Sequence, residues 1–366
     1  MDEEQRNAEA ERMVRAFEEN TEQDRIEGKY SASIRAKLTF VFVMLAVTII
    51  AVLCSLAIGS TDIPLIDVLK VIGHTLFPAW IDGPSQDYYT TVVINSRFPR
   101  TLLCLITGIS LAAAGTIMQG LLRNPLVSPF TLGVSTAASF GAALTIVLGS
   151  GYAFFYTTMS FGIISMSVKN ILIVILSFVF GMTSIMLVLK IAKKDASQST
   201  LVLSGVVISY LFQAGISLSQ YLSDDESLRT ISNWLMGGMW NATWGAVIIM
   251  APIVAVCVLY LEKMALDINT LSAGDEIARN VGVDVNSMRR KGLVVSTLTT
   301  SVCVAFTGDV GFIGLMGPHM TRMVIGNDSR SVMPPSAPIG ASILLFSDIV
   351  ARTILYPDPL PLGISL

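Results

Sequence analysis

The chain has 366 residues, of which 52% are hydrophobic and 14% charged, and its formal net charge is -3 at pH 7. This composition excludes an ordinary soluble domain and predicts an integral membrane protein. The basic residues form no continuous stripe, so no nucleic-acid partner is expected.

Residues 1–35 are predicted to form a cytosolic extension that is rich in acidic side chains. Ala10, Met13, Val14 and Phe17 would fall on one face of a helix, which indicates a short amphipathic helix. A solvated and partly disordered tail is an equally good interpretation. No cleaved signal peptide is expected ahead of the first long apolar run.

The remainder, residues 36–366, is predicted to be an all-α integral membrane domain, a polytopic helical bundle. A hydrocarbon core of about 30 Å requires about 20 apolar residues in a helix, and runs of this kind or slightly shorter recur along the chain. They cover residues 36–58, 98–119, 130–149, 170–190, 200–221, 244–262, 292–307, 313–326 and 338–355. With a cytosolic N-terminus, most Lys and Arg residues fall on the cytosolic side, as the positive-inside rule requires. The sequence therefore predicts nine crossings of the cell membrane.

The run at residues 98–119 is predicted to lie inside the bundle. Gly108, Ala112 and Gly115 give it a strip almost without side chains, which lets a helix approach its neighbours closely. Such a helix is expected to pack against protein rather than lipid.

The largest predicted cytosolic loop, residues 263–291, contains a short helix between Gly274 and Gly282. The residues that could form an apolar strip on it are Ile277, Ala278 and Val281. Nothing in this segment covers the strip, and two interpretations remain open. It is either a surface for a cytosolic partner or a connector that docks on its own bundle.

Several segments resemble the FecCD-type permease subunits of bacterial and archaeal ABC importers for iron-siderophores, haem and vitamin B12. The matching segments are Arg97–Arg100 (RFPR), Gln119–Leu126 (QGLLRNPL), Gly274–Gly282, Gly308–Gly314 (GDVGFIG) followed by Pro318 and His319, Ser347–Arg352, and Leu360–Gly363. Each is weak alone, but their common order along residues 60–364 argues against chance.

The resemblance implies a ten-helix subunit that forms a homodimer around one translocation path. Two ABC ATPase subunits would bind on the cytosolic side, and an extracytoplasmic substrate-binding protein would dock on the other. The sequence has no G-x-x-x-x-G-K-[ST] phosphate loop. ATP hydrolysis is therefore expected on a separate subunit, and this chain is expected to be a transport subunit rather than an enzyme.

The resemblance also implies three sets of functional residues. The ATPase-coupling segment would comprise Gly274, Asp275, Glu276, Ala278, Arg279 and Gly282. The residues that dock the binding protein would be Arg97, Arg100 and Arg352, although arginines at helix ends are more often snorkelling anchors. The cytoplasmic gate would comprise Asn124, Pro125, Leu126, Gln198 and Ser199, with a plain interfacial turn as the alternative.

Two carboxylates, Asp309 and Asp348, lie at or inside the edges of predicted helices. Asp348 could pair with Arg352, four residues later on the same helix. A structural ion pair is the preferred interpretation, and neither carboxylate is assigned a role in proton transfer.

The sequence departs from the family at its C-terminus, because family members continue through a tenth crossing and this chain stops at Leu366. About nine helices are therefore expected. The substrate remains open between ferric siderophore, haem, cobalamin and an oxyanion. The alternative function is a secondary transporter or channel that is not coupled to an ATPase. The four cysteines lie in apolar runs and the two histidines are far apart, so neither a metal site nor a cofactor is expected.

Overall fold

The computed structural model describes residues 34–366, apart from residues 60, 62, 162–163, 193–197, 273 and 356–358. The chain divides into two compact units, Met1–Leu45 and Ala46–Leu366. The predicted cytosolic extension falls almost entirely outside the described residues. A helix runs over Ile34–Ala57.

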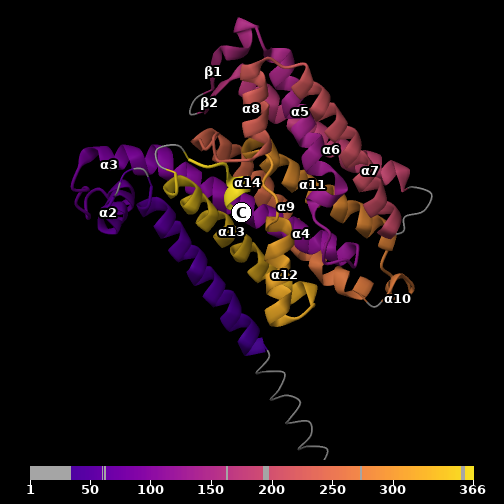
Figure 1. Cartoon of the computed structure of the whole chain (residues 1–366). Helices are drawn as coiled ribbons and strands as arrows, with labels where there is room; N and C mark the ends of the chain where they lie inside the picture. The colour runs from indigo at the N-terminus through magenta and orange to yellow at the C-terminus, as the bar shows by residue number, and fades with distance from the viewer. Residues whose placement is uncertain are drawn as a thin grey trace, which may run out of the picture. The chain divides into compact units, whose positions relative to one another are not determined.

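The second unit is built almost entirely from helices (Figure 1). The helices are α2 (Leu65–Leu76), α3 (Asp87–Val92), α4 (Phe98–Leu121), α5 (Val134–Gly149), α6 (Val168–Ile191), α7 (Gln198–Tyr221), α8 (Asp225–Leu235), α9 (Trp244–Ser272), α10 (Asp275–Asn280), α11 (Val285–Thr307), α12 (Ile313–Ile325), α13 (Ser329–Thr353) and α14 (Leu362–Ser365). Two short antiparallel strands, β1 (Thr158–Phe161) and β2 (Ile164–Ser167), precede α6. The predicted all-α polytopic bundle is confirmed.

Every predicted apolar run corresponds to a helix, but the helices differ in their ability to cross a membrane. Among the described residues, six are long and apolar enough by length and composition. The others fall short for local reasons. α5 has 16 residues, because its run begins with a 3-10 turn at Pro129–Leu132, and α12 has 13 residues. α11 begins with charged residues near Arg289 and Arg290.

Helix α4 lies inside the bundle, as its strip of small residues predicts, and packs against α9, α11, α12 and α13. A Cβ added at Gly108 would lie 2.5 Å from the Cα of Ala341 on α13. A Cβ added at Gly115 would lie 1.8 Å from the carbonyl oxygen of Gly314 on α12. Only glycine allows backbones to approach this closely. The close contacts therefore fix α4 against both neighbours.

The helix that contains α4 begins earlier than the sequence predicts. It is continuous over Asp87–Leu121 and passes through a π-helical turn at Val93–Arg97. In that turn the Phe98 N–H donates to the Val93 carbonyl oxygen, five residues back. Pro99 has no N–H to donate at this point, and the wider turn accommodates the interruption. The expected helix start near residue 98 is thus wrong by about three turns.

The functional residues expected from the sequence lie at the two opposite ends of α4. At its N-terminal end, Arg100 meets the C-terminal part of α13. At its C-terminal end, the following loop meets α7 and α10, and α10 in turn pairs with Arg289 of α11. The 24 residues of α4 separate these ends by about 36 Å, which is more than the thickness of the hydrocarbon core. The candidate site therefore has two parts, one at each end of the bundle.

Candidate functional site

Three arginines expected at the outer end line one pocket of about 180 Å³, which also contains Gly59 and Pro359. The pocket brings together Arg97, Arg100 and Arg352, which are separated by as many as 255 positions along the chain. Their shared position agrees with the expected grouping, but their side chains have different surroundings.

The carboxylate of Asp348 binds two of these arginines. The Nε of Arg100 donates to Asp348 Oδ1 at 2.9 Å, and the Nε of Arg352 lies 2.9 Å from Asp348 Oδ2. The side chain of Asp348 is fully buried, whereas those of Arg100 and Arg352 are 19% and 11% exposed. The predicted pair between Asp348 and Arg352 is confirmed. Since two cations share one buried carboxylate, removal of Asp348 would leave both guanidinium groups uncompensated.

Arg97 was expected to dock the binding protein or to be a snorkelling anchor, but its side chain is nearly buried. Only 5% of the residue is exposed. Its guanidinium donates to the carbonyl oxygens of Leu56, at 2.8 Å, of Ala57 and of Thr61. These carbonyls lie at and just beyond the C-terminal end of the helix over Ile34–Ala57, where a cation stabilises the helix. Arg97 therefore caps that helix.

The residues of the predicted cytoplasmic gate lie together. Asn124 and Pro125, in the loop after α4, line one pocket of about 470 Å³ with Gln198 and Ser199 at the start of α7. Asn124 Oδ1 accepts a hydrogen bond from the Leu126 N–H at 2.9 Å, which fixes the turn. Leu126 is 70% exposed and does not line the pocket.

Arg123 occupies a constrained position at the start of this loop. Its φ of 43° lies in the left-handed region, which a non-glycine residue rarely adopts. The side-chain amide of Gln198 can be oriented so that its nitrogen and its oxygen both form hydrogen bonds. In that orientation the nitrogen donates to the Leu122 carbonyl oxygen at 3.2 Å, and the oxygen accepts from Arg123 Nε at 3.0 Å. The loop is therefore attached to the start of α7 through Arg123.

The predicted coupling segment forms the six-residue helix α10. Gly274 and Gly282 bound it with φ values of 127° and 90°, which an L side chain rarely adopts. Ala278 is fully buried. The outward-facing apolar side chains are Ile277 and Val281, which are 51% and 68% exposed. The charged residues Glu276 and Arg279 are exposed as well. One face of α10 thus docks on the bundle, while Ile277 on the helix and Val281 directly after it are exposed.

Asp275, the first residue of α10, joins the coupling segment to two other elements. Its Oδ1 accepts from Arg123, and its Oδ2 lies 3.2 Å from an Nη of Arg289 on α11. Sequence reasoning assigned no role to either arginine. The only available signal was that Arg123 belongs to the QGLLRNPL segment; no spacing rule brings residues 123, 275 and 289 together.

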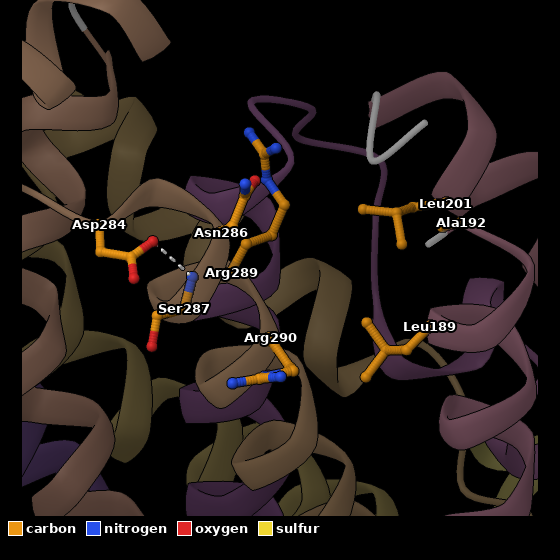
Figure 2. Close-up of a pocket in the computed structure, with 8 residues that line it drawn as sticks. All are labelled: Leu189, Ala192, Leu201, Asp284, Asn286, Ser287, Arg289 and Arg290. Atoms are coloured by element: carbon orange, nitrogen blue, oxygen red, sulfur yellow. Dashed lines mark hydrogen bonds between the residues drawn. The ribbon is translucent and has the colours of Figure 1, made fainter. Parts of the chain in front are cut away.

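A third pocket, of about 440 Å³, is lined in part by Arg289 near the start of α11 (Figure 2). One wall is formed by Leu189 on α6, Ala192 just after that helix, and Leu201 on α7. The other wall is formed by Asp284 and residues of α11. Asp284 caps α11 by accepting a hydrogen bond from the Ser287 N–H at 3.0 Å. Within the described part of the chain, no group of three or more His, Cys, Asp or Glu residues is placed to hold a metal ion.

The chain is similar to transport proteins over most of its length. The model of the FecCD transport family matches residues 47–366. The chain is 32% identical to the hemin transport system permease protein of Yersinia pestis over 335 residues, which cover 90% of this chain and 91% of that protein. It is 31% identical to the molybdate import system permease protein of Haemophilus influenzae, over 84% of this chain and 85% of that protein.

A solved structure supports the same relationship. It is an inward-facing ABC transporter of assumed metal-chelate type, with a TM-score of 0.75 and 28% sequence identity. The similarity covers 89% of this chain and 94% of that chain. From the family match and this architecture, the chain belongs to the FecCD transport family.

Proposed function

We propose that this chain is the permease subunit of an ATP-driven importer that carries a metal chelate across the cell membrane. The observation that carries the proposal is α10. It is bounded by glycines, and Ile277 on the helix and Val281 directly after it expose apolar side chains. Its first residue, Asp275, pairs with Arg123, which lines the gate pocket. A cytosolic partner that binds α10 could therefore act on the path through the membrane.

Two copies of a separate ABC ATPase are the proposed partners of α10. The relatives are permease proteins, and this chain has no phosphate loop of its own. A short helix whose inner face holds the fully buried Ala278 can transmit motion because it is docked on the bundle. The proposed orientation places α10 and the N-terminus in the cytosol, where most Lys and Arg residues then lie.

A second copy of the chain is the proposed partner of α7. The exposed apolar residues on this helix include Leu203, Val206, Val207, Tyr210 and Leu211. Leu203 and Val206 also line the gate pocket. A copy placed on this face would close the pocket and complete a path between two subunits, which is consistent with a closed two-fold dimer.

The proposed cargo is an iron chelate. The Yersinia relative is named for hemin, and the solved structure is assigned to the metal-chelate type. The Haemophilus relative is named for molybdate, which makes an oxyanion the second candidate. A separate extracytoplasmic protein is proposed to deliver the cargo at the outer end, where Arg100 and Arg352 are partly exposed and could meet acidic residues. The buried Arg97 is not included.

Uptake in cells tests this function. A strain without the chromosomal copy would receive the chain back, and accumulation of labelled ferric siderophore, ferric citrate, haem, cobalamin and molybdate would be measured. We expect deletion to abolish uptake of an iron chelate and the returned chain to restore it. Restoration of molybdate uptake alone would replace the proposed cargo, and restoration of no substrate by a correctly inserted chain would contradict the proposal.

A matched pair of variants tests the partner surface. Ile277 on α10 and Leu266 on α9 are both 51% exposed. We expect Ile277→Ser to lower ATPase copurification and uptake, because it removes apolar area from the proposed interface, and Leu266→Ser to leave both unchanged. Equal effects of the two substitutions would argue against α10 as the interface.

A further inference from the structure

We infer that Asp275 is the positioning residue that connects the ATPase-facing helix α10 to the cytoplasmic gate, through Arg123. The inference rests on the proposed function, because it assigns a role within the same transport cycle. It concerns an ionic link of three side chains, Asp275, Arg123 and Arg289, which we call the coupling link.

The first step is the way α10 is attached. Glycines with positive φ lie immediately before it and two residues after it, and a Cβ at either would meet no atom within 4 Å. These glycines are therefore present for backbone conformation rather than close packing. Ala278 is buried against the bundle, and the carboxylate of Asp275 forms ion pairs with two other elements.

The second step is the charge balance of the coupling link. One carboxylate stands between two guanidinium groups, and both pairs lie within ion-pair distance. Asp275 and Arg123 are 31% and 32% exposed, whereas Arg289 is only 6% exposed. Without the negative charge, the buried Arg289 and Arg123 would repel each other across the space that Asp275 occupies. Asp275 therefore holds together three elements that are far apart in the sequence.

The third step leads from Arg123 to the gate. Its Nη2 donates to Asp275, while its Nε reaches the Gln198 amide at 3.0 Å. A single planar guanidinium group thus bonds α10 on one side and the start of α7 on the other. The next residue, Asn124, begins the gate loop, and its N–H donates to the Gln119 carbonyl oxygen at 3.2 Å. A displacement of α10 therefore reaches both walls of the gate pocket.

The strained backbone of Arg123 fits this role. A residue with a left-handed φ stays there only when its surroundings hold it, and the bonds to Asp275 and Gln198 supply that hold. Loss of the link would let the loop relax independently of α10. The neighbouring residue Arg290 also lies on α11, but its side chain points in a different direction from that of Arg289 (Figure 2). The described bonds to Asp275 come from Arg289 and not from Arg290.

The test measures substrate transported per ATP hydrolysed by the complete complex in proteoliposomes. We expect Asp275→Asn to keep ATP hydrolysis but to lower transport per ATP by about tenfold, which is a typical coupling between sites. Arg123→Gln should have the same effect. The double variant should be no worse than either single one, because both remove the same link. Asp267→Asn removes an exposed carboxylate from the neighbouring helix α9 and should change nothing.

The outcomes separate this inference from the proposed function. If the unaltered complex shows no ATP-dependent uptake, the proposed function fails. If it does transport, unchanged transport per ATP in Asp275→Asn, or strictly additive losses in the double variant, would overturn the coupling link alone. Should Asp275→Asn fail to copurify with the ATPase, Arg123→Gln decides the question, since Arg123 lies outside α10. Retained coupling in that variant would also overturn the inference.

Discussion

Replacement of Gly115 by alanine is expected to force α4 and α12 apart. The new Cβ would lie 1.8 Å from the carbonyl oxygen of Gly314 and 2.6 Å from its carbonyl carbon. Relief of this overlap needs a shift of more than about 1 Å, since carbon atoms pack at about 3.5–4.0 Å. The obstructing atoms belong to backbone, so a helix has to move rather than a side chain.

The expected magnitude follows from two opposing terms. Overpacking of a core costs about 1–3 kcal/mol, and more when backbone is displaced. Alanine in place of glycine favours the helix by about 1 kcal/mol. Because the overlap is with backbone, the packing term should dominate, and we expect a net loss of about 2 kcal/mol.

Thermal unfolding of the detergent-solubilised protein, followed by tryptophan fluorescence, measures this loss. Gly311→Ala is the matched control, because a Cβ at Gly311 would meet no atom within 4 Å and its backbone is not in the left-handed region. We expect Gly115→Ala to lower the midpoint by a few degrees and Gly311→Ala to leave it nearly unchanged. Equal midpoints for Gly115→Ala and the parent protein would refute the close packing of α4 on α12.

Three further predictions concern the outer end of the bundle. Asp348→Ala should lower the free energy of unfolding by about 3–5 kcal/mol, because the guanidinium groups of Arg100 and Arg352, which are largely covered by protein, lose their shared buried partner; a loss below about 1 kcal/mol in an unfolding titration would contradict this. Arg97→Gln should lower the free energy of unfolding by about 2 kcal/mol, because it removes charged hydrogen bonds to the end of the helix over Ile34–Ala57. Loss of this cap should make the chain near residue 58 easier to cleave, so an unchanged rate of proteolysis there would contradict the capping role. Hydrogen bonds from the side chain and backbone of Ser85 hold the pKa of Asp67 below its ordinary value. This stabilisation should be complete above about pH 4 and lost as the pH falls through the lowered pKa. Asp67→Asn should therefore reduce the acid sensitivity of the unfolding midpoint, and an identical pH profile would contradict the assignment.

Much of the helical bundle could be predicted because the relevant information is local. Apolar runs of sufficient length locate the helices, and the spacing of Gly108 and Gly115 places α4 inside the bundle. The four-residue spacing of Asp348 and Arg352 was enough to predict their ion pair. These features depend on helical periodicity, which the sequence displays directly.

Other features depend on contacts between distant segments, and no periodicity reveals them. Arg100 joins the Asp348 pair from 248 positions away, and Arg123 meets Asp275 across 152 positions. The burial of Arg97 depends on the carbonyl groups at the end of another helix. Sequence reasoning identified Arg97 and Arg100 as functional through a family resemblance and assigned no role to Arg123. It could not tell which partners any of the three binds.

ATP dependence of transport tests the central claim most directly. The permease would be purified with its ATPase, reconstituted into proteoliposomes and supplied with the binding protein carrying labelled ferric chelate. We expect accumulation only when hydrolysable ATP is present on the side of the ATPase, and none with a non-hydrolysable analogue. Accumulation driven by an ion gradient in the absence of ATP would contradict the account and identify the chain as a secondary transporter.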